Sequence, residues 1–294
     1  MRRLFLFLHL LVWSALLSGC RAERRGSPAE APAATPTTSS ASAAGGARRI
    51  VTLAPNLTEI VFALGAGDRL VGVSEYSDYP EAARAIPRVG GLEVDPERVA
   101  ALSPELVLAI AEGSGRGAVG ALQAAGVPVV VVPSGSLDAV LEAIRIVGQR
   151  LGREAESQAL VEELSRKRAA VRARAATSRR PRALLLVWPD PPQAAGAGTF
   201  LDDVLHEAGG DNVVAQRRGW PLLSKEYLAT ADVDVLVVPD SAETRPAYER
   251  AFSTGPLSRG PIARARVVRL DEAALTRPGP RVFDMLERLS QALR

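Results

Sequence analysis

The sequence has few of the residues that build disulfides and metal sites. Cys20 is the single cysteine among 294 residues, so no disulfide can form within one chain and no cysteine-based zinc site is possible. Of the two histidines, His9 lies in an apolar N-terminal segment, which leaves His206 for the rest of the chain. Zinc and manganese sites in proteins commonly combine several histidines. We therefore predict no metal site and no cofactor.

Aromatic residues and lysines are also scarce. Aromatic residues make up 4% of the chain, and its only lysines are Lys167 and Lys225. The formal net charge of +3 falls to +1 without Arg2 and Arg3. An arginine-rich run over residues 166–182 falls on a predicted helix and its end, as is typical of a solvated helix face. We expect no nucleic-acid partner.

The chain lacks the common motifs of hydrolases. Neither a Gly-x-Ser-x-Gly elbow nor a His-Glu-x-x-His pair occurs, and the adjacent Asp202 and Asp203 point to different helix faces. The stretch from Gly115 to Gly120 has the glycine spacing of a dinucleotide-binding turn, but the next predicted strand ends at Val132 without the acidic residue that such a fold requires. An NAD-dependent enzyme is a remote alternative, and we predict that the chain is not an enzyme.

The N-terminal segment has the pattern of a bacterial export signal. Arg2 and Arg3 precede an apolar stretch, Leu4–Leu17, that is too short to span a hydrocarbon core of ~30 Å comfortably. The following Leu17-Ser18-Gly19-Cys20 resembles a lipobox, in which the cysteine is acylated and becomes the mature N-terminus. We predict a signal peptide over residues 1–19, lipidation of Cys20, and attachment to the periplasmic face of the inner or outer membrane.

A low-complexity segment follows the predicted anchor. Residues 20–47 are rich in Ala, Pro, Ser, Thr and Gly and show no apolar periodicity. Such a segment buries too little surface to offset its ordering entropy. We predict a lipid-anchored flexible tether, followed from residue 48 by a folded part long enough for two lobes.

Seven apolar runs predict β-strands in two series, with helical segments between them. The runs are continuous and not alternating, which favours strands buried on both faces and hence parallel sheets covered by helices. The predicted strands are Ile50–Ala54, Leu70–Val73, Leu106–Ile110 and Val129–Val132, then Ala183–Val187, Val235–Val238 and Val267–Leu270.

A helical linker separates the two series. Ser136 is suited to cap a first helix, Gly152 divides the linker, and a second helix over Arg153–Thr177 spans ~36 Å before Pro181 ends the pattern. The fold class is therefore α/β. We predict an N-terminal lobe over residues 48–135, a helical linker over 136–180 and a C-terminal lobe over 181–294.

The two lobes contain a matched pair of short segments. Asp95-Pro96-Glu97 and Ser224-Lys225-Glu226 each open a predicted helix, and a predicted strand begins nine residues after each glutamate. Asp95 and Ser224 are helix-capping residue types, and a glutamate in the first turn is favoured by the helix dipole. This equivalence suggests two similar lobes that each display one carboxylate.

Several segments resemble the Fe/B12 periplasmic-binding family, in the same order along the chain. They are Ile50–Glu59, Leu64-Gly65, Val71–Pro80, Pro87–Gly91, Glu97–Val107, Ala208–Asn212 and Gly219–Pro221. The resemblance implies a class III substrate-binding protein of an ABC importer, with two Rossmann-like lobes joined by one long helix and a ligand cleft between the lobes. It is strongest to the vitamin B12-binding subgroup, which implies cobalamin or a related corrinoid as the ligand. A ferric siderophore or haem is the alternative.

The resemblance also implies which residues contact the ligand. Two matching positions, Pro55 and Asn56, start a predicted helix at the cleft. The others are side chains in loops: the aromatic residues Tyr76 and Trp220, and the cation Arg277. The subgroup has further tryptophans where this chain has the segments 90–93 and 110–113, and Trp188 is a candidate replacement for one of them.

The matched glutamates have a role in the same resemblance. Glu97 and Glu226 correspond to carboxylates that dock into arginine pockets of the transporter. The implied partners are the importer's permease and ATPase, a small-molecule ligand, and the membrane through the lipid anchor. We expect the protein to be a monomer.

Overall fold

The computed structural model describes residues 46–91, 93–111 and 116–294. The predicted signal peptide, Cys20 and the predicted tether up to residue 45 lie outside the described residues. Within the described ranges, no helix has the length and apolar character needed to cross a membrane.

The N-terminal lobe is built on a four-stranded parallel sheet in the order β2-β1-β3-β4. The strands are β1 (Ile50–Thr52), β2 (Leu70–Val73), β3 (Leu106–Ile110) and β4 (Val129–Val132), as predicted except that β1 is shorter. It is shorter because Pro55 begins a helix after the extended Ala54. Around this sheet lie α1 (Pro55–Ala63), α2 (Pro96–Ala101) and α3 (Arg116–Ala124), with 3₁₀ turns η1 (Gly67–Arg69) and η2 (Glu81–Ala85).

The C-terminal lobe has a five-stranded sheet with a parallel centre. The three predicted strands are present and longer than expected, as β5 (Arg182–Pro189), β8 (Val235–Asp240) and β9 (Arg266–Asp271). Two further strands were not predicted because they are short and polar: β6 (Pro192–Ala194), antiparallel to β5, and β7 (Asp211–Asn212), parallel to it. The helices are α6 (Phe200–Glu207), α7 (Lys225–Thr230), α8 (Arg245–Ser253), α9 (Glu272–Thr276) and α10 (Val282–Ala292), with the turn η3 (Pro261–Arg264).

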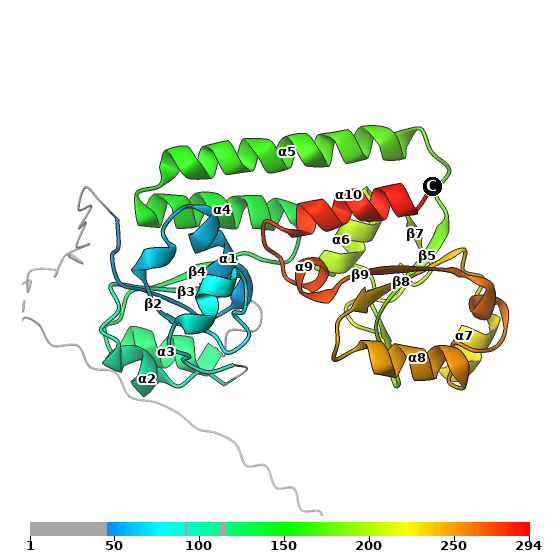
Figure 1. Cartoon of the computed structure of the whole chain (residues 1–294), viewed down its shortest axis with the longest axis horizontal. Helices are drawn as coiled ribbons and strands as arrows, with labels where there is room; N and C mark the ends of the chain where they lie inside the picture. The colour runs from blue at the N-terminus through cyan, green and yellow to red at the C-terminus, as the bar shows by residue number, and fades with distance from the viewer. Residues whose placement is uncertain (1–45, 92, 112–115) are drawn as a thin grey trace, which may run out of the picture. The chain divides into compact units, whose positions relative to one another are not determined.

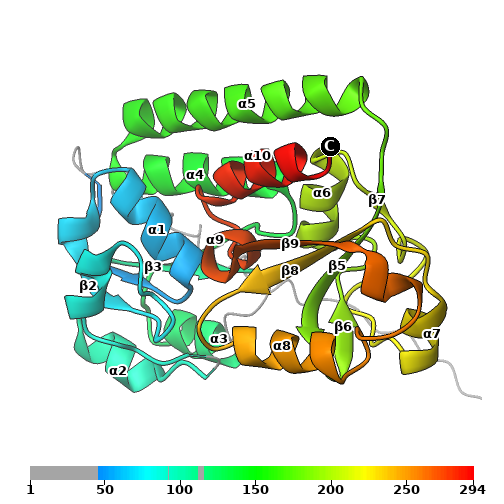
Figure 2. The ribbon, with the colours of Figure 1, turned by 45° about the vertical axis from the view of Figure 1, so that its right-hand side comes forward.

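Two antiparallel helices connect the sheets (Figure 1). They are α4 (Leu137–Leu151) and α5 (Glu154–Ala176). The predicted cap is confirmed, because the Ser136 hydroxyl accepts a hydrogen bond of 3.1 Å from the Ala139 amide. Gly152 separates the helices with φ of 63°, a left-handed conformation that glycine adopts without a side-chain penalty. Helix α5 packs against both α4 and α10 (Figure 2).

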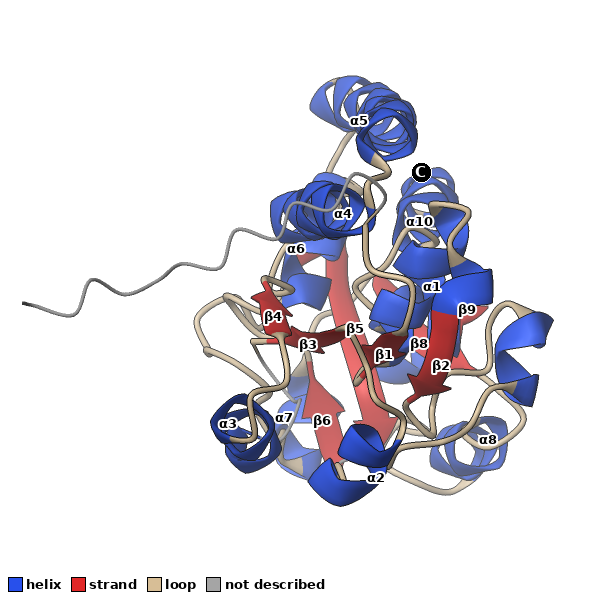
Figure 3. Ribbon diagram, turned by 90° about the vertical axis from the view of Figure 1, so that its left-hand side faces the viewer, coloured by secondary structure: helices blue, strands red, loops and turns tan. Residues whose placement is uncertain are grey.

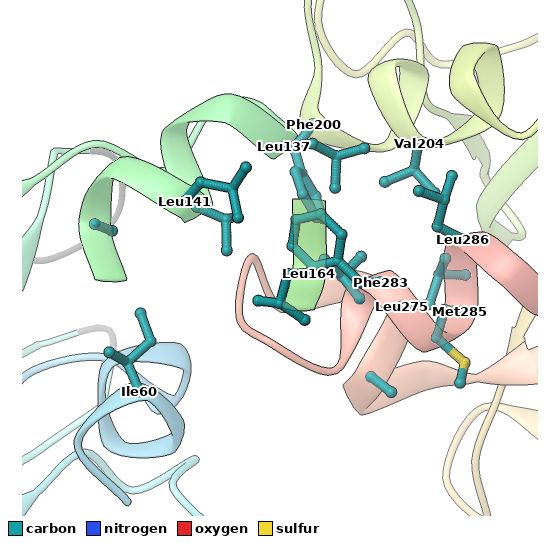
Figure 4. Packing of buried hydrophobic residues seen from close by; sticks show 14 of the residues in the cluster. Ile60, Leu137, Leu141, Leu164, Phe200, Val204, Leu275, Phe283, Met285 and Leu286 are labelled. Atoms are coloured by element: carbon teal, nitrogen blue, oxygen red, sulfur yellow. The ribbon is translucent and has the colours of Figure 1, made fainter. Parts of the chain in front are cut away.

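The central strands of each sheet are buried on both faces, as the continuous apolar runs predicted (Figure 3), whereas the edge strands β4 and β9 expose Val131 and Val267. In β3, Leu106 and Leu108 face one cluster while Val107 and Ala109 face another. In β8, alternate residues likewise belong to two different clusters. One cluster contains residues of both sheets and of the linker helices, so the lobes share a continuous core. Figure 4 shows part of it, with side chains from α1, α4, α5, α6, α9 and α10.

A buried ion-pair network fastens the linker to the C-terminal lobe. Glu207 at the end of α6 accepts hydrogen bonds from Arg168 and Arg172 of α5, and Arg168 also pairs with Asp138 of α4. We call these four residues the linker cluster. Burial alone raises the pKa of Glu207, but the hydrogen bonds from Arg168 and Arg172 outweigh it and hold the pKa below its usual value. Because Glu207 and Arg168 are both buried, the network also fixes how α5 lies on α6.

Candidate functional site

The loop after β2 is held from within by a chain of buried hydroxyl groups. Thr52 in β1 bonds Thr58 in α1 at 2.7 Å, Thr58 bonds Ser77 at 2.8 Å, and Ser77 bonds Ser74 at 2.9 Å. All four residues are buried. Arg88 adds two hydrogen bonds to the carbonyls of Ser74 and Ser77. The loop is therefore fixed to the carboxyl end of the sheet, where ligands bind in open α/β folds.

Tyr76 projects from this fixed loop and is 50% exposed. Its ring lies against Gly91: a Cβ added at Gly91 would lie 3.0 Å from Tyr76 Cε2 and 3.2 Å from its hydroxyl oxygen. A larger side chain at position 91 therefore cannot be accommodated unless Tyr76 moves.

The start of α1 meets the C-terminal lobe. Pro55 occupies the first helical turn, as predicted, and Asn56 is 2% exposed. The Asn56 side-chain amide donates a hydrogen bond of 3.2 Å to the carbonyl of Pro278. Asn56 thus joins the two lobes directly.

One turn further along α1, a buried carboxylate holds an arginine of the other lobe. Glu59 accepts two hydrogen bonds from Arg281, at 2.6 and 2.9 Å. The segment between Arg277 and Arg281 is Pro-Gly-Pro, and a Cβ at Gly279 would lie 3.4 Å from a Glu59 carboxylate oxygen. Glycine therefore allows the backbone to approach α1 closely at this point.

Arg277 is the second arginine of this contact. Its guanidinium pairs with Asp78 of the Tyr76 loop at 2.5 Å and lies 3.7 Å from Glu59. Burial alone raises the pKa of the Asp78 carboxyl, but the hydrogen bond and charge of Arg277 outweigh this and hold it below its usual value. Arg281 also lies 4.0 Å over the ring of Tyr79 and 3.8 Å from Asp271. We call the charged residues Glu59, Asp78, Asp271, Arg277 and Arg281 the joint cluster.

The two predicted tryptophans lie in a different part of the C-terminal lobe. Trp188 at the end of β5 is 39% exposed, and Trp220 is 48% exposed. They are brought near each other by Gln193, which pairs with Trp188 in the β5–β6 register and whose side-chain amide donates to the Trp220 carbonyl at 3.4 Å. Trp188 also lines a pocket of about 660 Å³ with residues of α7 and α8, including Lys225 and Arg250.

The predicted ligand residues thus form two groups. Asn56 and Arg277 take part in the contact between the lobes, Pro55 precedes Asn56, and Tyr76 lies two residues before Asp78, which pairs with Arg277. Trp188 and Trp220 form the second group, in the C-terminal lobe.

The predicted docking glutamates occupy equivalent places. Glu97 and Glu226 are exposed in the first turns of α2 and α7. Asp95 caps α2 by accepting from the Glu97 and Arg98 amides, and Ser224 caps α7 by accepting from the Tyr227 amide at 3.1 Å, so both predicted caps are confirmed. Each helix precedes the strand, β3 or β8, that lies between two others in its sheet. Hydrogen bonds from its own backbone amide and from Ser224 lower the pKa of Glu226.

Groups suited to catalysis or metal binding are not brought together. Asp202 accepts from the Asn212 side-chain amide, whereas the adjacent Asp203 accepts from the Leu137 amide, so they have different partners. His206 is exposed beside Arg180. Within residues 46–91, 93–111 and 116–294, no three or more His, Cys, Asp or Glu side chains gather as a metal site.

Sequence analysis missed Glu59, Asp78 and Arg281. Glu59 had a detectable signal, because it stands among Leu57, Ile60 and Val61 on a helix that has little polar surface. A carboxylate in such surroundings requires a cationic partner. That partner is more than 200 residues away, and the sequence alone does not identify it.

Comparisons with known proteins match most of the length of this chain. A family model described as periplasmic binding protein matches residues 50–258. The chain is 28% identical to the uncharacterized ABC transporter substrate-binding lipoprotein YvrC of Bacillus subtilis, over 84% of this chain and 80% of the relative. It is 29% identical to a vitamin B12-binding protein of Yersinia pestis, over 84% and 86%. The solved structure of the periplasmic heme-binding protein RhuT from Roseiflexus matches with a TM-score of 0.77 and 32% identity, over 84% of this chain and 98% of that one.

Proposed function

Because the chain belongs to the periplasmic binding protein family, we propose that it captures a tetrapyrrole for an ABC importer, with cobalamin or a related corrinoid as the first candidate. Members of this family bind a small molecule and work with a permease and an ATPase, and they are not enzymes. The proposal concerns which ligand this member takes and which residues hold it.

One observation carries the choice of ligand class. Tyr76 and Trp220 expose about half of their surface, 50% and 48%, in a chain where aromatic residues make up 4%. Aromatic side chains are normally buried in part, and exposed flat rings at the carboxyl ends of strands are suited to stack on a flat apolar ligand. A tetrapyrrole macrocycle offers such a face. Two similar proteins, one named a vitamin B12-binding protein and one a periplasmic heme-binding protein, support the same class.

Haem is the second candidate, and Tyr76 is the reason. Tyr76 is half exposed, and its hydroxyl lies beside Gly91. A tyrosine oxygen is one of the groups that hold haem iron in proteins. A ferric siderophore ranks lower, because such ligands favour free arginines and both arginines of the joint cluster already have carboxylate partners.

The delivery step rests on the exposed glutamates. Glu97 and Glu226 have equivalent positions before a central strand of each sheet, so they suit a partner that engages both lobes at once. We propose that they pair with arginines of the permease, and that Cys20 is lipidated and keeps the protein near it. In vesicles containing the importer, Glu97→Ala with Glu226→Ala should abolish stimulated uptake and leave ligand affinity within about twofold. Undiminished uptake would contradict this role.

Ligand binding is tested by titrating the purified mature protein with cyanocobalamin, haemin and a ferric siderophore. Quenching of tryptophan fluorescence reports binding. Tyr76→Ala and Trp220→Ala should each weaken binding about tenfold, as expected for a lost stacking contact. Tyr76→Phe separates the two candidates, because it retains the stacking face and removes the oxygen that would bind iron. The proposal is refuted if neither cyanocobalamin nor haemin binds. Binding of the ferric siderophore alone would also contradict it.

A further inference from the structure

The joint cluster contains more negative than positive charge. Its carboxylates belong to Glu59, Asp78 and Asp271, and its guanidinium groups belong to Arg277 and Arg281. Arg281 is committed to Glu59 by two hydrogen bonds. Both carboxylate oxygens of Glu59 thus already accept from Arg281, and Glu59 lies 3.7 Å from Arg277. Asp78, at 2.5 Å, is therefore the main partner of Arg277.

Asp78 is placed to act on a ligand without being needed for the loop's structure. Its side chain is 48% exposed, compared with 17% for Arg277 and 3% for Glu59. The loop that carries it is held by the Ser74, Ser77 and Thr58 hydroxyls and by Arg88, none of which bonds the Asp78 carboxylate. The negative charge can thus be changed while the loop stays in place.

We propose that Asp78 determines the charge preference of the ligand site. Asp78 lies two residues after Tyr76 in the same loop, and it neutralises Arg277. It therefore favours a ligand whose rim carries neutral amides over one whose rim carries carboxylates. A carboxylate approaching Arg277 must displace Asp78 or lie beside it, and like charges at that distance repel. A neutral amide oxygen can accept from the remaining N–H groups of Arg277 while Asp78 stays bound. This inference rests on the proposed capture of a tetrapyrrole.

Matched pairs of ligands test this preference. Haemin and its dimethyl ester differ in two carboxylates, and cyanocobalamin and its monocarboxylic acid differ in one. The measurement is the ratio of the two dissociation constants within each pair, at constant ionic strength. For the natural protein the ratio should favour the neutral member. Asp78→Asn should shift it toward the carboxylate by about two- to fivefold, which is the upper part of the range for partly exposed charge pairs.

Two further variants complete the design. Asp211→Asn is the matched control, since Asp211 is exposed and its carboxylate has no hydrogen bond or ion pair among the described residues. It should leave the ratio unaltered. Adding Arg277→Gln to Asp78→Asn should cancel the shift, because the freed cation is then gone.

The outcomes separate this inference from the proposed function. If the natural protein binds tetrapyrroles but Asp78→Asn leaves both ratios as they were, the charge role of Asp78 is wrong and the proposed function stands. The same conclusion follows if Asp78→Asn weakens both members of a pair equally. If the natural protein binds none of the four ligands, the proposed function fails and this inference fails with it.

Discussion

Two charged clusters connect the parts of this protein, and they differ in what their exposed members pair with. In the linker cluster, the side chains of Arg168 and Glu207 are 7% and 4% exposed, and each has more than one partner. Its outer members Asp138 and Arg172 are 78% and 57% exposed, and in the joint cluster Glu59 is likewise 3% exposed whereas Asp78 is 48% exposed. Both clusters have a buried centre and an open edge, but the open edge of the joint cluster includes Asp78, which pairs with the predicted ligand residue Arg277.

This difference separates structural from functional charge. An ion pair inside the protein cannot lose one member without leaving an unpaired buried charge, so changing it is costly. An exposed carboxylate contributes little to stability because water screens it. We therefore expect the linker cluster to hold the fold, and the open edge of the joint cluster to be where a ligand is sensed.

The largest predicted effect is in the linker cluster. Glu207→Gln leaves Arg168 with only half of its anionic partners and should lower the free energy of unfolding by about 3 kcal/mol, as for other broken buried pairs. Urea denaturation followed by circular dichroism measures the change. Glu287→Gln, which removes a 40% exposed partner of Arg174, is the control and should cost under about 0.5 kcal/mol. Equal losses in the two variants would show that burial does not set the contribution of Glu207 to stability.

The buried part of the joint cluster should come next. Glu59→Gln keeps one acceptor for Arg281 but removes the charge, and we expect a loss of about 2 kcal/mol in the same denaturation experiment. The loss is smaller than for Glu207 because the side chain of Arg281 is 21% exposed, whereas that of Arg168 is 7% exposed. A loss greater than that of Glu207→Gln would show that the joint, and not the linker, dominates the connection.

A third prediction concerns the surface around Tyr76. Gly91→Ala places a Cβ 3.0 Å from the Tyr76 ring and should displace that side chain, weakening ligand binding about threefold to tenfold. Fluorescence titration measures this. Gly120→Ala is the matched control, since a Cβ there meets no atom within 4 Å, and it should bind as the natural protein does. Unchanged binding by Gly91→Ala would show that the contact with Gly91 does not fix Tyr76 in its ligand-binding position.

The smallest effect is expected for Asp78→Asn on stability. Its folded-state pKa lies below its usual value, so its contribution is present at neutral pH and is lost as the pH falls through that lowered pKa. Because the side chain is half exposed, the cost at pH 7 should be under about 0.5 kcal/mol. Thermal unfolding at pH 7 and at pH 2.5 checks both size and sign. A large loss at pH 7 would make Asp78 a structural residue like Glu207.

The sequence predicted elements whose signal is local. All seven predicted strands are present, and so are the Ser136, Asp95 and Ser224 caps and the break at Gly152. Each of these signals depends on residues near one another in the sequence. The short strands β6 and β7 had no apolar signal, because pairing with β5 defines them.

The candidate site was less predictable for a related reason. Single residues such as Tyr76 and Arg277 were identified by resemblance, but the pairing of Arg277 with Asp78 and of Arg281 with Glu59 joins segments about 200 residues apart. Charge type alone does not reveal which of 33 acidic residues each of these arginines meets. Only the folded arrangement shows that Asp78 neutralises Arg277.

Direct titration of the purified mature protein is the most direct test of the central claim. Cyanocobalamin and haemin are added separately while tryptophan fluorescence and the visible absorbance of the ligand are followed. We expect saturable binding of at least one of them, with a dissociation constant of about 1 µM or lower, weakened by Trp220→Ala. If neither ligand binds at concentrations up to about 100 µM, capture of a tetrapyrrole is contradicted.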